Sequence, residues 1–286
     1  RQVGARLRDQ RVLVHGAGAG GVGVAEAIRQ GMLREGLSPE EALARIFVLD
    51  SKGLLTERRK ITGYKAPFAQ PDANLAGWSF AGDTPDLLET IREGGVTVLL
   101  GLSGQAGAFS EAVCRATAEN TPHPFIFPLS NPTSSCEAIP TDVFAWTGGR
   151  AKVATGSPFD PVPYNGDLHP IGQGNNAFIF PGLGMAAILG YVTRITDAMV
   201  MRASDALVEY TAERHPGLLY PPVAELAEVS VRVATRVLEQ ALADGVAQIP
   251  ERWVAQGALD DLEGYVRSHF FQPRYLPVVK AERRAV

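Results

Sequence analysis

One stretch decides the fold: Arg11-Val12-Leu13-Val14-His15-Gly16-Ala17-Gly18-Ala19-Gly20-Gly21-Val22-Gly23. Its apolar beginning is typical of a buried parallel strand. The glycines that follow let backbone N–H groups approach a pyrophosphate, and the helical residues behind them would point a helix N-terminus at the anion. The stretch therefore predicts a strand, a tight turn and a helix that bind the diphosphate of a dinucleotide.

The composition indicates a globular α/β chain of 286 residues, of which 45% are hydrophobic, with a net charge of −4. This mild charge gives no electrostatic reason to expect nucleic acid or an anionic membrane surface as a partner. No apolar run reaches the roughly 18 residues of a membrane span, and residues 1–10 do not have the pattern of a signal peptide. Cys114 and Cys136 lack metal-ligand spacing and predict reduced thiols in a cytoplasmic protein.

Apolar strands alternate with helical stretches through the first part of the chain. A helix restarts at Ser38, with Pro39 at its first position and Glu41 completing a capping box. The alternation predicts a Rossmann-like, doubly wound, mainly parallel sheet with helices on both faces. Strands are expected at 12–15, 47–50, 96–100, 125–129 and 152–155, and helices at 22–35, from 83 or 84, and at 110–120.

From about Phe178 the pattern is helical and contains no predicted strand. Helices are expected at 182–193, 197–213 and 223–244, with Asp197 as a cap and Gly245 as a stop. The last 40 residues indicate irregular segments and short helices, and end in a basic tail from Lys280 to Arg284. We therefore predict a Rossmann-type nucleotide-binding domain at 1–176 and a helical C-terminal segment at 177–286.

The glycine loop supplies the first predicted cofactor contacts. Gly16 permits the tight turn, Gly18 lets the backbone meet a phosphate, and Gly21 lets the helix approach the sheet. Gly23 is expected at a further position of close packing. The predicted contacts are Gly16, Ala17, Gly18, Gly21 and Gly23. The alternative is a glycine-rich turn without a ligand, but the flanking strand and helix favour dinucleotide binding.

Asp50, at the end of the second strand, is the candidate for the ribose hydroxyls, with a solvent-exposed acid as the alternative. Ser51 and Lys52 follow directly, and Lys65 lies farther on. These three residues could bind the 2′-phosphate of NADP or merely form a polar turn. Both NAD and NADP are therefore candidate cofactors.

A second loop of small and polar residues follows the strand at 96–100: Gly101-Leu102-Ser103-Gly104-Gln105-Ala106-Gly107. Ligands of open α/β sheets bind at the carboxyl ends of the strands. Ser103 and Gly104 are therefore predicted beside the nicotinamide ring, with a simple strand–helix turn as the alternative.

Three later segments are more specific: Pro128-Leu129-Ser130-Asn131-Pro132-Thr133, Ala154-Thr155-Gly156-Ser157-Pro158-Phe159-Asp160-Pro161-Val162 and Gly172-Gln173-Gly174-Asn175-Asn176-Ala177-Phe178-Ile179-Phe180-Pro181-Gly182. In this order, behind the glycine loop, they closely resemble the NAD(P)-binding domain of malic enzymes. The resemblance extends from about Val12 to about Ala243.

The resemblance implies oxidation of L-malate with NAD or NADP, followed by decarboxylation to pyruvate and CO2. It also implies Mg or Mn as the Lewis acid, a Lys/Tyr pair that moves protons, and a homo-oligomer for the full-length enzyme. Malolactic enzymes look similar and form lactate, so the product stays open.

In malic enzymes the asparagines of the Ser-Asn-Pro-Thr and Gly-Asn-Asn motifs reach the substrate and the nicotinamide. The resemblance assigns Asn131 to both ligands, Asn175 to the cofactor and Asn176 to the substrate. A carboxamide can donate to a malate carboxylate and accept from the nicotinamide amide. Asparagines that bond only to the local backbone are the alternative.

The family's catalytic Tyr, general-base Lys, substrate Arg and Glu-Asp…Asp metal ligands lie ahead of the glycine loop. The sequence offers no counterpart for them, so no catalytic residue and no metal ligand is assigned. We expect a fragment that binds cofactor without turnover, whose segment 177–286 would pack on a missing N-terminal catalytic domain. The alternative from another class is a non-catalytic nucleotide-binding module.

The remaining polar candidates are given structural roles. Asp160 and Asp167 are flanked by Pro or Gly and predict turns, while His169 and His15 are expected to be packed. A helix start near Cys136 would lower the pKa of its thiol, although a buried thiol is the simpler interpretation.

The helices after Asn176 have a strongly apolar face that includes Met185, Ile188 and Leu189. These side chains are expected to expose apolar surface in the separated segment. We therefore predict that the chain self-associates or is less stable than its size indicates.

Overall fold

The computed structural model describes residues 3–271 of the chain. Its contacts divide these residues into two compact units. The first unit contains the residues up to Asn176 together with Val208–Glu225, and the second contains Ala177–Leu207 and the residues from Leu226 onward. The predicted basic tail, Lys280 to Arg284, lies outside the described residues.

The first unit is built on a sheet that has seven strands among the described residues, in the order β3-β2-β1-β4-β5-β6-β9. All neighbouring pairs are parallel except β2 and β3. The predicted Rossmann-like, mainly parallel sheet is thus confirmed. The strands are β1 (Val12–His15), β2 (Ile46–Asp50), β3 (Gly53–Leu54), β4 (Val98–Gly101), β5 (Phe125–Pro128), β6 (Lys152–Thr155) and β9 (Gly172–Gln173).

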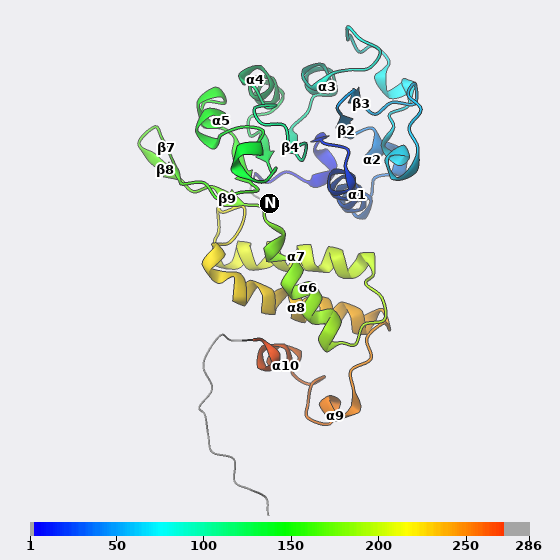
Figure 1. Ribbon diagram of the computed structural model, residues 1–286, viewed down its shortest axis with the longest axis vertical. Coiled ribbons are helices and arrows are strands. Elements are labelled where there is room, and N and C mark those ends of the chain that lie inside the picture. Colours follow the sequence, from blue (N-terminus) through cyan, green and yellow to red (C-terminus); the bar gives the residue numbers. More distant parts are fainter. Residues whose placement is uncertain (1–2, 272–286) are drawn as a thin grey trace, which may run out of the picture. The chain divides into compact units, whose positions relative to one another are not determined.

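Side chains alternate between the two faces of the sheet, and each face has its own core. Leu13 and Phe47 belong to the core beneath α3, α4 and α5, whereas Val14 and Val48 belong to the core beneath α1 and α2. Helices α3, α4 and α5 lie together on one side of the sheet in Figure 1. Their bounds are α1 (Ala19–Arg34), α2 (Pro39–Leu43), α3 (Leu87–Gly94), α4 (Glu111–Asn120) and α5 (Pro140–Trp146).

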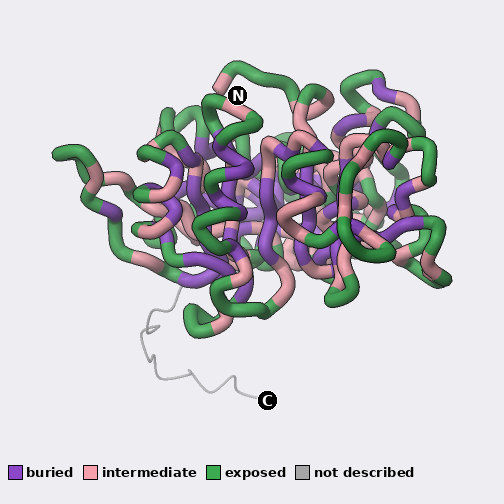
Figure 2. Tube along the Cα trace, turned by 90° about the horizontal axis from the view of Figure 1, so that it is seen from above, coloured by how far each residue is buried: buried purple, intermediate pink, exposed green. Residues whose placement is uncertain are grey.

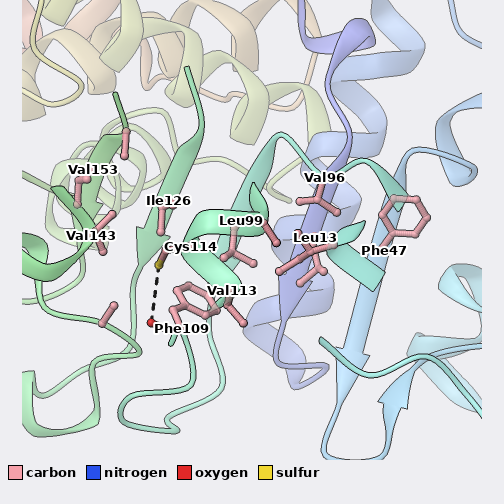
Figure 3. Packing of buried hydrophobic residues seen from close by; sticks show 14 of the residues in the cluster. Leu13, Phe47, Val96, Leu99, Phe109, Val113, Cys114, Ile126, Val143 and Val153 are labelled. Carbon is pink, nitrogen blue, oxygen red and sulfur yellow. Dashed lines mark hydrogen bonds between the residues drawn. The ribbon is translucent and has the colours of Figure 1, made fainter. Parts of the chain in front are cut away.

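The core beneath α3, α4 and α5 joins neighbouring strands to the helix that covers them. Figure 3 shows Leu13, Leu99 and Ile126, from β1, β4 and β5, beside Phe109 and Cys114. The Cys114 thiol donates to the carbonyl of Phe109 over 3.7 Å. Figure 2 shows buried residues along the inner segments of the trace and exposed residues in its outer turns.

Local signals account for two helix starts. Ser38 accepts from the Glu41 amide and Glu41 accepts from the Ser38 amide, which confirms the predicted capping box with Pro39 at its first position. Helix α3 has an equivalent box between Asp86 and Glu89, so it begins later than the predicted Asp83 or Thr84. Short 3-10 helices occur at Leu7–Asp9, Gly63–Phe68, Asp72–Leu75, Thr133–Ser135, Asn176–Phe178 and Val223–Glu225.

A hairpin that the sequence analysis did not predict follows β6. Its strands, β7 (Val162–Tyr164) and β8 (Asp167–His169), pair antiparallel. Asn165 and Gly166 at the turn both have positive φ. The sequence Asn-Gly between short extended runs is a strong hairpin signal. Asp167 therefore begins a strand beside the turn, rather than lying in the turn as expected.

The second unit is helical. Close packing of α6 on α8 requires small residues, because a Cβ on Gly182 would lie 2.7 Å from the Val233 side chain. The last turn of α8 ends before Gly245, which has φ 66° and is the predicted stop. The helices are α6 (Phe180–Leu189), α7 (Asp197–Arg214, which contributes to both units), α8 (Leu226–Ala243), α9 (Glu251–Val254) and α10 (Leu262–His269). None of the helices among residues 3–271 combines the length and the hydrophobicity of a membrane-spanning segment.

Candidate functional site

The site lies at the carboxyl ends of β1 and β4. The chain pairs β1 with β2 on one side and returns to pair β4 on the other. In an open parallel sheet, this reversal of strand order leaves a crevice beside the first strand. The glycine loop after β1 and the loop after β4 meet there, because the Leu102 amide donates to the His15 carbonyl over 2.8 Å.

Two glycines of the first loop are required by packing. Gly16 has φ 128°, and a Cβ on it would overlap the Leu102 carbonyl. A Cβ on Gly21 would overlap the Gly16 carbonyl. Ala17 has its side chain buried in the core, so only its backbone is available at the loop. The backbone at Gly16 and Gly21 is therefore packed too closely against neighbouring carbonyls to admit a side chain, as expected for these two glycines.

The outer side of this loop is open. Helix α1 begins after Gly18, has no side-chain cap and carries no acidic residue in its first turn. A Cβ on Gly18 would meet no atom within 4 Å, and Gly18 is exposed. The first amides of a helix attract anions, so this surface fits a diphosphate. A Cβ on Gly23 would also meet nothing within 4 Å, so the close packing expected at Gly23 is wrong.

Asp50 ends β2 on the other side of β1. One of its carboxylate oxygens accepts from the Lys52 amide over 2.8 Å, and the other forms an ion pair of 2.6 Å with Arg59. Burial opposes ionisation, but these hydrogen bonds and the charges of Arg59 and Lys65 outweigh it and lower the pKa of Asp50. The group is thus an oriented anion at the strand end.

The basic and hydroxyl candidates near Asp50 differ in position. Ser51 and Lys52 are exposed in the turn between β2 and β3, and Lys65 is half-buried in the 3-10 helix Gly63–Phe68. Arg59, which was not among the residues predicted from the sequence, also donates to the carbonyls of Gly53 and Leu54. No local signal distinguishes Arg59 within its Lys- and Arg-rich connection.

Glu137 is the second residue that the sequence analysis missed. It is fully buried, and its carboxyl accepts from the amide and hydroxyl of Ser103 and from the amide and hydroxyl of Ser130. These serines belong to the loops after β4 and β5. A fully buried Glu is unusual unless it is paired. The only sequence signal is an acid within the run Cys136-Glu137-Ala138-Ile139.

The three motifs at the carboxyl ends of β5, β6 and β9 are joined to one another by hydrogen bonds. The Ser157 hydroxyl donates to the Asn131 side-chain oxygen over 2.6 Å, and the Gly174 amide donates to the Thr155 carbonyl over 2.7 Å. Asn131 and Asn176 are exposed, and Asn175 is half-buried. The structure thus brings Asn131 near the loop that contains Ser103 and Gly104, since the Gly104 amide donates to the hydroxyl oxygen of Ser130.

Both histidines with structural assignments are packed. His15 is 7% exposed, and its buried Nδ1 atom has no hydrogen-bond partner in the part of the chain that the structure describes. Burial lowers the pKa of His15, and the nearby Glu137 opposes this shift. The His169 ring lies 4.9 Å from that of Phe144, measured between centroids. Asp160 is exposed.

The two cysteines are free and buried. Burial raises the pKa of the Cys114 thiol to about 12, with a smaller contribution from the charge of Asp142. Burial also raises the pKa of Cys136, so the idea of a thiol activated by a helix start is wrong. Within residues 3–271 there is no group of three or more His, Cys, Asp or Glu side chains that could hold a metal ion.

Comparison with known proteins places this site in a family context. The family model described as the malic enzyme NAD-binding domain matches residues 1–242. A NAD-dependent malic enzyme of Edwardsiella ictaluri is 45% identical over 247 residues, which are 85% of this chain and 44% of that protein. Another, of Pectobacterium carotovorum, is 41% identical over 278 residues, which are 96% of this chain and 48% of that protein. The chain thus spans about half the length of the curated relatives it matches.

Solved structures share the fold. The crystal structure of a malic enzyme from Entamoeba histolytica matches with a TM-score of 0.66 at 24% identity, over 93% of this chain and 50% of that one. A malic enzyme from Pyrococcus horikoshii gives 0.65 at 22% identity, over 93% of this chain and 56% of that one. At this identity the likeness concerns the fold.

Proposed function

Since the chain belongs to the malic enzyme family through its NAD-binding domain, we propose that it binds NAD and forms the cofactor-binding part of an enzyme that converts L-malate to pyruvate and CO2. One observation carries the proposal: the glycine loop offers open helix amides that Gly16 and Gly21 hold in place. The curated relatives named above are NAD-dependent malic enzymes, which favours NAD over NADP.

The cofactor's diphosphate would lie on the amides from Gly18 onward, and its adenosine ribose beside Asp50. An ionised carboxylate can accept from two ribose hydroxyls and repels a 2′-phosphate. The oriented anion of Asp50 therefore supports NAD. Ser51, Lys52 and Lys65 would line the same side of the crevice.

The nicotinamide half would lie over β4 and β5, beside Ser103 and Gly104. When bound, NAD supplies the acceptor for the hydride of malate. Asn131 and Asn175 would hold the carboxamide of the ring, while Asn131 and Asn176 would donate to the malate carboxylates. Neutral amides suit this task because they orient both ligands without a charge that perturbs hydride transfer.

Among residues 3–271, no group of three or more His, Cys, Asp or Glu side chains could hold the Mg or Mn ion of the family. The metal ligands and the proton-transferring Tyr and Lys would belong to the half of such a protein that this chain does not span, and the complete protein would be a homo-oligomer. The chain by itself would bind cofactor without turning over malate.

Titration of the chain with NADH and NADPH, followed by nicotinamide fluorescence, tests the proposal. We expect saturable binding of NADH, displacement by NAD, and weaker binding of NADPH. The Gly21→Ala variant provides the negative control, because its Cβ would displace the loop. Absence of saturable binding for either reduced cofactor would refute the proposal.

A further inference from the structure

The loops after β4 and β5 share one buried acceptor. The Ser103 amide and hydroxyl both lie 2.9 Å from Glu137 Oε1, and the Ser130 hydroxyl lies 2.5 Å from the same atom. The Ser130 amide lies 3.3 Å from Oε2. Two loops that are far apart in sequence are thus joined through a single carboxyl.

The two serine hydroxyls are held in a defined direction. Each hydroxyl donates its hydrogen to Glu137. The serine oxygen therefore stays free to accept from an amide of the loop after β4. The Ser130 oxygen accepts from the Gly104 amide over 2.9 Å, and the Ser103 oxygen accepts from the Gln105 amide over 3.1 Å. The carboxyl therefore fixes the backbone of residues 103–105 through a chain of hydrogen bonds.

The carboxyl is also sterically fitted to the strand end. A Cβ on Gly101 would lie 2.5 Å from the Glu137 carboxyl carbon. The backbone of Glu137 takes part as well, since its carbonyl accepts from the Phe109 amide over 2.9 Å. The group is fully buried beneath the loops, so it cannot itself touch a ligand on their outer side.

The number of these hydrogen bonds is not by itself a measure of stability. A buried polar network is frequently no more stable than an apolar replacement of similar volume, whereas it can specify one geometry. The geometry specified here is that of the loops at the carboxyl ends of β4 and β5. In a dinucleotide fold these ends face the half of the ligand opposite the β2 acid.

From these contacts we infer that Glu137 is a positioning residue, which holds the loops of Ser103–Gln105 and Ser130–Asn131 where the nicotinamide end of the cofactor binds. This inference rests on the proposed function. It assigns Glu137 no contact with the cofactor, but makes the nicotinamide half of the site depend on it. None of these hydrogen bonds of Glu137 reaches the diphosphate half, at Gly16–Gly21.

The Glu137→Gln variant tests the inference. Whichever way its amide is turned, an NH2 group faces either the Ser103 amide or the Ser130 amide, so one backbone donor loses its acceptor. Affinities for NADH and for ADP-ribose, which lacks the nicotinamide, are measured by fluorescence and by calorimetry. We expect NADH to bind about tenfold more weakly, with a smaller gain in nicotinamide fluorescence, while ADP-ribose binding stays within about twofold.

Glu111→Gln is the matched control, because Glu111 is an exposed acid on α4 whose ion pair among residues 3–271 is with Arg115. It should leave both affinities unchanged. If Glu137→Gln fails to fold, Ser130→Ala, which removes one donor, is measured in its place with the same expected selectivity.

The inference is overturned if wild-type and variant bind NADH equally, or if NADH and ADP-ribose lose affinity to the same extent. Absence of NADH binding by the wild-type chain would instead refute the proposed function. The two failures are therefore distinguishable.

Discussion

Arg59 Nη2 lies 2.6 Å from Asp50 Oδ2, and the two side chains are only 16% and 19% exposed. Arg59 also donates to the carbonyls of Gly53 and Leu54, so it joins the end of β2 to the edge strand β3. The acid proposed to bind ribose is thus already oriented by a cation before any ligand arrives. This preorganisation lowers the cost of ordering the site on binding.

Arg59→Ala should destabilise the chain and weaken its binding of NADH. Loss of the guanidinium leaves one oxygen of a half-buried carboxylate and two carbonyls without this donor, which costs about 1–3 kcal/mol. Urea unfolding measures the stability and fluorescence titration the affinity. The exposed pair Arg115–Glu111 provides the control, because Arg115→Ala should cost less than about 1 kcal/mol. Equal losses in the two variants would contradict this account.

Gly18→Ala and Gly21→Ala should separate binding from folding. A Cβ on Gly21 would overlap the Gly16 carbonyl, so this variant should lose about 1–3 kcal/mol of stability through overpacking, together with NADH binding. A Cβ on Gly18 would meet nothing within 4 Å. Gly18→Ala should therefore keep its melting temperature while it binds NADH more weakly. Thermal unfolding and titration check both, and unchanged NADH affinity in Gly18→Ala would argue against a diphosphate at this loop.

The sequence predicted those features that depend on neighbouring residues. The glycine turn, the capping box of Ser38 and Glu41, and the mainly parallel sheet all follow from local spacing and from the alternation of strands and helices. The Asn165-Gly166 hairpin was also predictable in principle, since its turn signal is local.

Arg59 and Glu137 illustrate what the sequence could not provide. Each acts through partners that the fold brings together: Glu137 lies 34 positions from Ser103, and Arg59 reaches across a turn to Asp50. Nothing in the residues around either of them specifies that contact. Likewise, the return of Val208–Glu225 to the first unit has no local signal.

His15 should make stability depend on pH below neutrality. Burial lowers its pKa from 6.5, so between the folded and unfolded pKa values the unfolded chain binds more protons. The free energy of unfolding therefore falls as the pH drops below about 6.5, by up to about 1.4 kcal/mol per pH unit for one group. His15→Leu should reduce this slope because leucine does not titrate, and among the described residues Nδ1 has no hydrogen-bond partner to lose. Urea unfolding between pH 7 and 5 measures it, with the exposed His123→Leu as control. A slope unchanged by His15→Leu would show that His15 does not cause it.

Exposed apolar side chains on α6 should cause the chain to self-associate. Phe180 and Ile188 are 71% and 75% exposed. Full burial of a large apolar side chain is favourable by about 1.5–3 kcal/mol of free energy. Two such residues on one short helix favour a contact that removes them from water. We expect the sedimentation coefficient to rise with protein concentration, and the double variant Phe180→Gln, Ile188→Gln to abolish this rise without loss of helix content. Val254→Gln, at a side chain that is 38% exposed on α9, should leave the association intact. A wild-type chain that stays monomeric at all concentrations would show that these side chains tolerate water, and the prediction would fail.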